Sequence, residues 1–163
     1  DGFALKFHGA RRLTLEAWKG LEAAKGSVVF VSGSSALQPK AALAAVGTIN
    51  AAVVALAKAF ADRGLASAIT VNSVLPGPVM TDRRRAMVER MAASRGIGVA
   101  DAVEAFVTEA GISRFGAPGD IAAVVVGEVA DADVQAVASE IGEPDCTFAK
   151  HAQEAHWAAA MLD

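Results

Sequence analysis

The sequence predicts an α/β fold in which a parallel sheet is doubly wound by flanking helices. Two short apolar runs, 27–33 and 67–77, are rich in β-branched residues, which favours strands. The segment between them, 41–63, has its apolar residues at helical spacing and is followed by Gly64. A strand, a helix and a second strand in this order form a βαβ unit with parallel strands. The run 27–33 is almost entirely apolar, so we expect a strand that is buried on both faces.

Further helices are predicted on both sides of this unit. Apolar residues or composition indicate helices at 3–24, 82–93 and 101–111. Asp101 and Glu104 have the spacing of an N-terminal cap, and Pro118 fits the first turn of one more helix. No repeat or long linker divides the 163 residues, which predicts a single domain over 1–163.

Composition excludes several classes of function. The formal net charge is -3, whereas a general nucleic-acid binder carries a basic surplus, so we expect no nucleic-acid partner. The purely apolar runs, such as 121–126, are far shorter than the roughly 20 residues of a membrane-spanning helix, so no membrane partner is expected. The single cysteine, Cys146, forms no internal disulfide, and no basic, apolar leader is visible, which favours the cytoplasm. His8, His151 and His156 lie in no ligand cluster, so no metal site is expected.

One segment carries a specific motif after the second strand. The residues 69–81 follow the pattern Asn-x-Val-x-Pro-Gly-x-Val-x-Thr, which falls on Asn72, Val74, Pro76, Gly77, Val79 and Thr81. Together with 26–35, 46–64 and 114–122, this motif resembles the short-chain dehydrogenase/reductase family. The resemblance covers 26–122 and implies a Rossmann-like fold and ancestry among NAD(P)-dependent oxidoreductases that act on carbonyl or alcohol substrates.

The motif also implies where a cofactor would bind. By resemblance, Asn72, Pro76, Gly77, Val79 and Thr81 form the cofactor-binding loop for NAD or NADP. The backbone of Val79 would pair with the nicotinamide carboxamide, and Thr81 would bond the carboxamide or a phosphate. A loop that leaves the carboxyl end of a parallel strand is where ligands bind in open α/β sheets. The alternative is that Pro76 and Gly77 form only a tight turn.

The family's catalytic tetrad is replaced at all four positions. The resemblance places Lys6 at the family's Asn, Gly33 at its Ser, Val46 at its Tyr and Asn50 at its Lys. The family's Tyr is the acid or base, its Lys lowers the Tyr pKa and holds the ribose, its Ser orients the substrate oxygen, and its Asn holds a relay water. Val46 has no proton to exchange, and the 163 residues contain no tyrosine.

Substitutes for the lost groups are present nearby. A shift of one residue would bring Ser32 or Ser34 into the serine role. Lys6 or His8 would be the substitute acid, but residues two apart point to different sides of a helix, so at most one of them faces the site. The alternative is that both are solvated helix residues.

The segment order departs from the family as well. We find no glycine-rich first βαβ unit, and we reject 94–98 as a phosphate site because no strand precedes it. The segment 124–146 resembles an earlier part of the family, with a strand ending at Glu128-Val129, and 149–152 resembles its Asn-Asn-Ala-Gly strand end. The chain thus resembles a permuted or truncated family member, whose two termini would lie close together. The alternative is a plain C-terminal helix.

These patterns support three hypotheses of function. The leading one is an oxidoreductase-derived protein with little or no hydride transfer of its own, and with cofactor binding weakened or lost. The second is a non-catalytic scaffold or homo-oligomer that associates through helices 3–24 and 44–63. The third is an active oxidoreductase with an atypical proton relay through Lys6 or a nearby serine.

Overall fold

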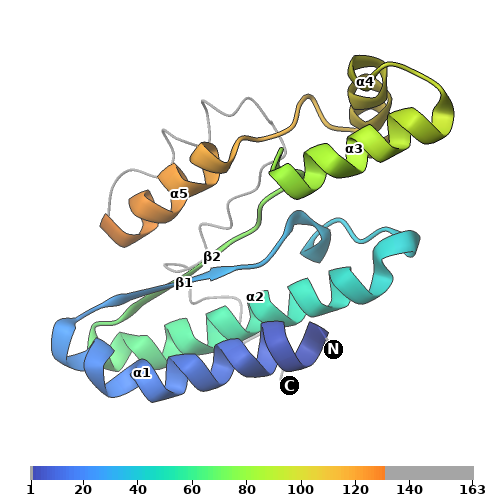
Figure 1. Ribbon diagram of the computed structural model, residues 1–163. Helices are drawn as coiled ribbons and strands as arrows, with labels where there is room; N and C mark the ends of the chain where they lie inside the picture. Colours follow the sequence, from blue (N-terminus) through green and yellow to red (C-terminus); the bar gives the residue numbers. More distant parts are fainter. Residues whose placement is uncertain (1, 131–163) are drawn as a thin grey trace. The chain divides into compact units, whose positions relative to one another are not determined.

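The structure, a computed structural model, describes residues 2–130 of the chain (Figure 1). These residues divide between two compact units, 2–75 and 76–130. The single domain predicted for 1–163 remains a prediction.

The first unit is a βαβ unit preceded by a long helix. Its elements, in order, are η1 (Phe3–Gly9), α1 (Ala10–Ala24), β1 (Ser27–Val31), η2 (Ser34–Ala36), η3 (Ala41–Leu43), α2 (Ala44–Gly64), η4 (Leu65–Ser67) and β2 (Thr70–Val74). The predicted helices 3–24 and 41–63 are confirmed, although η1 is a π-helix rather than an α-helix. Both predicted strands are confirmed at reduced length.

The two strands pair in parallel, as the βαβ prediction required. The register runs from Ser27 opposite Thr70 to Val31 opposite Val74. The return from α2 to β2 is tight, because a Cβ at Gly64 would collide with the carbonyl oxygen of Ile69. Glycine is therefore needed at the end of this helix for close approach of backbone, and its conformation stays helical.

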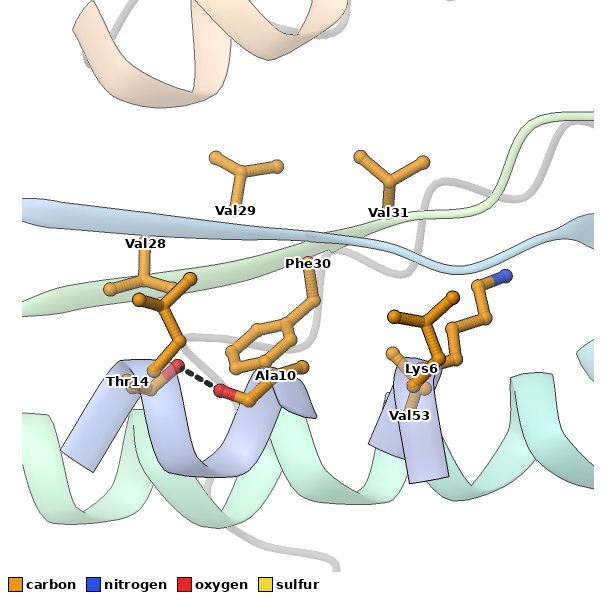
Figure 2. A pocket seen from close by; sticks show the side chains of 10 residues that line it. Lys6, Ala10, Thr14, Val28, Val29, Phe30, Val31 and Val53 are labelled. Carbon is orange, nitrogen blue, oxygen red and sulfur yellow. Dashed lines mark hydrogen bonds between the residues drawn. The ribbon is translucent and has the colours of Figure 1, made fainter. Parts of the chain in front are cut away.

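The core of this unit lies between one face of the sheet and the helices α1 and α2. Figure 2 shows Val28 and Phe30 pointing toward the helices, whereas Val29 and Val31 point to the opposite side. Phe60 packs on Trp18 and Phe30, with ring centroids 5.6 Å and 6.0 Å apart. The cluster consists of Trp18, Phe30, Val53, Ala57, Phe60, Ile69 and Val71.

The prediction that the first strand is buried on both faces is wrong. Val31 remains 50% exposed, although Phe30 beside it is only 5% exposed. An apolar run therefore does not guarantee two covered faces; here one face carries the packing and the other does not.

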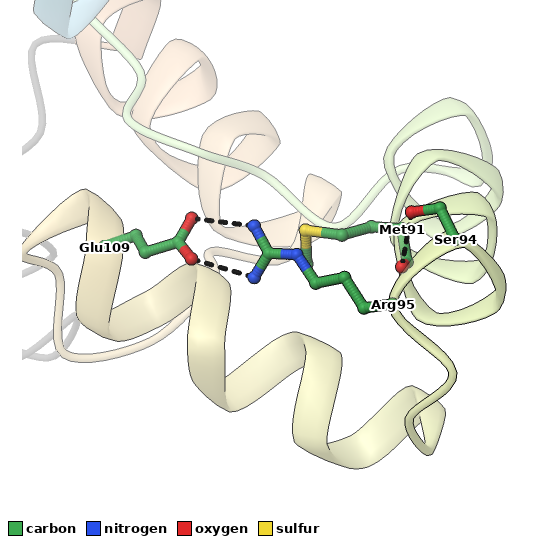
Figure 3. Close-up of polar contacts among 4 residues, drawn as sticks. All are labelled: Met91, Ser94, Arg95 and Glu109. Atoms are coloured by element: carbon green, nitrogen blue, oxygen red, sulfur yellow. Dashed lines mark hydrogen bonds and ion pairs between the residues drawn. The ribbon is translucent and has the colours of Figure 1, made fainter.

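The second unit consists of a loop and helices. It contains α3 (Asp82–Arg95), α4 (Val99–Ala110) and α5 (Pro118–Ala130), and an isolated parallel bridge joins Val79 to Gly116. The helices α3 and α4 pack through Val88, Ala92 and Ala102. Figure 3 shows the exposed ion pair that also joins them, in which Arg95 donates to Glu109 at 2.8 and 3.4 Å.

The boundaries of these helices confirm some predictions and correct others. The helix at 82–93 and the one starting at Pro118 are confirmed, and 94–98 lies at the junction of α3 and α4, as expected. The predicted cap at Asp101 is wrong, because α4 begins at Val99 with Gly98 as its N-cap, which places Asp101 inside the first turn.

The predicted strand ending at Glu128-Val129 is also wrong, because α5 continues through both residues to Ala130. The predicted strand end at 149–152 and the second terminus lie outside the described residues.

One described helix has the length and apolarity of a membrane span. The segment Ala41–Ser67 has a mean hydropathy of 1.8 over its most apolar window. The purely apolar runs of the sequence, which are much shorter, predict no membrane span. The same segment supplies Val53, Ala57 and Phe60 to the core of the first unit, and this packing accounts for part of its apolar character.

Candidate functional site

Three of the four residues that the resemblance assigns to the tetrad lie together in the first unit. The Nζ atom of Lys6 donates to Oδ1 of Asn50 at 2.6 Å and to the carbonyl oxygen of Ser32 at 2.9 Å. Gly33 lies against the same amide, because a Cβ placed on it would be 2.7 Å from Nδ2 of Asn50. Residues from η1, from the segment that follows β1 and from α2 therefore converge on one polar cluster. We call it the Lys6 cluster, and it consists of Lys6, Ser32, Gly33, Ser35 and Asn50.

The Asn50 amide organises this cluster. Only 4% of Asn50 is exposed. Its Oδ1 accepts from Lys6, and its Nδ2 donates to the hydroxyl of Ser35 at 2.8 Å. A lysine ammonium can only donate, so the amide orientation with oxygen toward Lys6 is the one that satisfies both ends. Asn50 thus holds the lysine on one side and the loop after β1 on the other.

The serines divide between two roles. Ser32, one of the two predicted substitutes, is 7% exposed and donates its hydroxyl to the backbone carbonyl of Asn50 at 2.8 Å. This bond ties β1 to α2 and engages the Ser32 proton. Ser34, the other, starts the short turn η2, and it is Ser35 whose hydroxyl joins the Asn50 side chain. The sequence offered three serines around Gly33, and only the turn geometry distinguishes them.

Val46 differs from the other three positions. It lies on α2 one turn before Asn50, is 49% exposed, and brings only an aliphatic side chain. The position that the resemblance assigns to the proton donor therefore holds no group that can exchange a proton.

Lys6 has neutral partners. It is partly buried, and burial lowers the pKa of its amine below the usual value. Within residues 2–130, no carboxylate lies within ion-pair distance of it. His8 is exposed and packs edge-on against Phe7 with ring centroids 5.2 Å apart, whereas Lys6 donates to the cluster. Which of the two faces a catalytic site remains a prediction.

A groove adjoins the lysine. It has a volume of about 340 Å³ and lies between the beginning of α1 and the strand β1. Its wall is mainly aliphatic and includes Leu5, Leu13 and Val31. Figure 2 shows the Lys6 side chain at one end of the labelled lining residues, with its nitrogen beyond Val31 in the direction of the strand.

The predicted cofactor loop follows β2. Asn72 lies within β2, opposite Val29, and belongs to the first unit, whereas 76–81 belongs to the second. In the loop, Met80 N–H donates to Gly116 O at 2.8 Å, and Gly116 N–H donates to Pro78 O at 3.0 Å. The groups that flank Val79 are therefore engaged. The N–H of Val79 itself has no hydrogen-bond acceptor within the described range 2–130.

The other loop residues have clear local roles. Thr81 is the N-cap of α3, and its hydroxyl accepts from the N–H of Arg84 at 3.3 Å. A Cβ on Gly77 would meet no atom of the described residues within 4 Å, so no contact within the described part of the chain requires glycine there. Pro76 begins the second unit. No group of three or more potential metal ligands occurs among residues 2–130.

Comparison with known proteins places these features in a family. Residues 2–132 match the family model described as enoyl-(acyl carrier protein) reductase. The acetoacetyl-CoA reductase of Shinella zoogloeoides is 27% identical over 119 residues, which cover 72% of this chain and 45% of that protein. The chain thus spans about half the length of the curated relative that it matches.

Solved structures share the fold. The L-sorbose reductase of Gluconobacter frateurii, solved with NADPH and L-sorbose, matches with a TM-score of 0.71 and 23% identity, over 77% of this chain and 48% of that one. A short chain dehydrogenase family protein from Francisella tularensis matches with a TM-score of 0.62 and 26% identity, over 75% and 52%. The Rossmann-like α/β fold predicted from the sequence is confirmed, and the chain belongs to the short-chain dehydrogenase/reductase family.

Proposed function

We propose that this chain is a short-chain dehydrogenase/reductase that has little or no hydride-transfer activity of its own. The observation that supports the proposal is Val46 at the position of the family's proton donor. Hydride addition to a carbonyl leaves an alkoxide that must receive a proton, and a valine has none to give. Of the other three positions, two keep a polar side chain of different chemistry, Lys6 and Asn50, and the third is Gly33.

The exchange of side chains between helices supports this reading. The family has an amide on the first helix and an ammonium on the second, whereas this chain has the Lys6 ammonium on the first and the Asn50 amide on the second. Their contact at 2.6 Å keeps a cation and an amide together. Without a phenol beside it, the ammonium has no group whose pKa it would lower.

A nicotinamide cofactor fits the loop after β2 in one respect. The N–H of Val79, which has no acceptor among residues 2–130, would donate to the carboxamide oxygen, and the Thr81 hydroxyl is a second polar group on the same loop. The cofactor, when bound, would supply or accept the hydride. We propose that NAD or NADP binds here weakly, and that the substrate class remains a carbonyl or an alcohol, as in the named relatives.

The first test combines binding with turnover in the purified chain. We expect saturable but weak binding of NADPH or NADH by calorimetry, and no oxidation of NADPH with acetoacetyl-CoA as the carbonyl probe. Turnover by the unaltered chain would contradict the proposal. If that turnover disappeared in Lys6→Met, the atypical relay through Lys6 would be supported instead.

The second test restores the tetrad. Lys6→Asn, Gly33→Ser, Val46→Tyr and Asn50→Lys are introduced together, because a serine at 33 conflicts with the present Asn50 amide. We expect NADPH oxidation to appear in this variant. The matched control carries Val46→Phe in place of Val46→Tyr, which has a ring of similar size without the hydroxyl. Equal activity in both would show that the tyrosine proton is not the missing element.

A second candidate function rests on a separate observation. The apolar helix Ala41–Ser67 is only 28% buried in its most apolar window, and Leu13 on α1 is 72% exposed. Such apolar surface favours association of copies through α1 and α2, as in a scaffold or homo-oligomer. Light scattering behind size exclusion tests this proposal: a stable monomer for the chain, unchanged by Leu13→Asp, would contradict it.

A further inference from the structure

The Lys6 amine combines features that do not belong to an ordinary surface lysine. It borders the aliphatic groove between α1 and β1, and burial favours its neutral form. Its two hydrogen-bond acceptors, Asn50 Oδ1 and Ser32 O, are both uncharged. A carboxylate would hold the amine in its charged form, and none lies within ion-pair distance among residues 2–130.

The two hydrogen bonds that hold the ammonium would also orient the amine once it has lost a proton. A neutral lysine amine has two N–H bonds and one lone pair. Asn50 Oδ1 at 2.6 Å and Ser32 O at 2.9 Å take the two hydrogens. The lone pair is then the direction that remains for an electrophile. A lysine that is desolvated at an apolar surface and keeps its lone pair available is the kind that forms Schiff bases with carbonyl compounds.

We propose that Lys6 is a nucleophilic amine that condenses with an aldehyde or ketone whose aliphatic part lies in the groove between α1 and β1. The Nζ lone pair forms a bond to the carbonyl carbon, and the π electrons of the carbonyl move to its oxygen, which takes up a proton. The nitrogen loses a proton, which gives a neutral carbinolamine. The hydroxyl then takes up a proton from solvent and leaves as water, while the nitrogen lone pair forms the C=N bond, which gives the protonated imine. The condensation consumes no oxidant or reductant, and water is its only other product.

The surroundings suit each end of such an adduct. The protonated imine keeps one N–H, for which Asn50 Oδ1 or Ser32 O remains as an acceptor. Leu5 and Leu13 are exposed by 80% and 72%, and they offer aliphatic surface to the carbon chain of the ligand. The ligand class is therefore a small carbonyl compound with an aliphatic tail. This reaction is independent of hydride transfer and of the cofactor loop.

The experiment traps the imine in the folded chain. The purified 163-residue chain is incubated with butanal and sodium cyanoborohydride near neutral pH, and peptide mapping by mass spectrometry follows each amine over time. Fragment ions separate Lys6 from the amine of the chain terminus, which also reacts. We expect Lys6 to be butylated several-fold faster than Lys19, an exposed lysine on α1 that serves as the matched control.

Two further measurements test whether the reactivity of Lys6 depends on the folded groove. Leu13→Asp places a carboxylate on the groove wall at a position that is 72% exposed, so the fold tolerates it, and it should slow labelling of Lys6 but not of Lys19. In urea, the preference for Lys6 should disappear. Equal rates for Lys6 and Lys19 in the folded chain would overturn the proposal, as would a Lys6 preference that persists in urea or is unaffected by Leu13→Asp.

Discussion

The contact between Gly33 and Asn50 allows a quantitative test of the Lys6 cluster. In Gly33→Ala the new Cβ would lie 2.7 Å from Nδ2 of Asn50, well inside the ordinary contact distance, and 3.4 Å from its Cγ. The backbone at Gly33 is extended, with φ of 174°, so alanine suffers no conformational strain there. The cost of the substitution therefore comes from the side-chain collision alone.

The expected loss of stability is the cost of the collision minus the gain from replacing glycine by alanine. Overpacking of this kind costs about 1–3 kcal/mol. Replacing glycine by alanine in an allowed conformation returns roughly 0.4–1 kcal/mol by restricting the unfolded chain. We therefore expect a net loss of about 1–2 kcal/mol in the free energy of unfolding. Asn50 cannot retreat without weakening its bonds to Lys6 and Ser35.

A double-mutant cycle isolates the collision. Urea unfolding, followed by circular dichroism, is measured for Gly33→Ala, Asn50→Ala and the double variant. In the Asn50→Ala background the amide is absent, so Gly33→Ala should be neutral or slightly stabilising, with a coupling free energy of about 1–3 kcal/mol. The reasoning is refuted if Gly33→Ala costs the same in both backgrounds, or if it costs nothing in the unaltered chain.

Two more predictions concern the core and a helix terminus. Phe60→Ala should lower the free energy of unfolding by about 3–5 kcal/mol, because the ring is 6% exposed in the aromatic cluster, whereas exposed Leu13→Ala should change it little; urea titration distinguishes them. The N–H of Ala117, at 2.8 Å, holds the pKa of Asp120 below its usual value, so the carboxylate stabilises the fold above about pH 4 and loses this effect as the pH falls through the folded-state pKa. In urea unfolding, Asp120→Asn should therefore lower the free energy of unfolding of the second unit at pH 7, and the difference from the unaltered chain should vanish at low pH. The exposed control Glu89→Gln should show no such difference at pH 7. A difference between Asp120→Asn and the unaltered chain that is the same at every pH would contradict this account.

Much of the fold could be predicted because its signals are local. The helical period of 41–63 and the β-branched runs on either side were enough for a parallel βαβ unit. Where a signal was ambiguous, the prediction failed. The apolar run at 124–126 before Glu128-Val129 suits a strand or a buried helix equally, and α5 takes it. The cap at Asp101 failed because Gly98, which has no side chain to recognise, is the N-cap.

The site could be predicted in its positions but not in its contacts. The family motif located Lys6, Gly33 and Asn50, and the structure brings the three together. No sequence pattern predicts that the Lys6 ammonium reaches an amide 44 residues away, or that the Ser35 hydroxyl joins the same cluster. Such contacts depend on helix packing and on the shape of the turn after β1, neither of which has a local sequence signal.

Because Phe3–Gly9 is a π-helix, the direction of the Lys6 side chain depends on the number of residues in this turn. A π turn contains one residue more than an α turn, so it acts as a single-residue insertion in an otherwise continuous helix. Each residue of an α-helix advances by about 100°, so removing one residue between Lys6 and Ala10 would rotate the lysine by that angle around the helix axis. Every side chain would be retained, yet the ammonium would turn away from Asn50. A change in chain length alone, with no change of residue type in the site, would therefore remove the cation from the site.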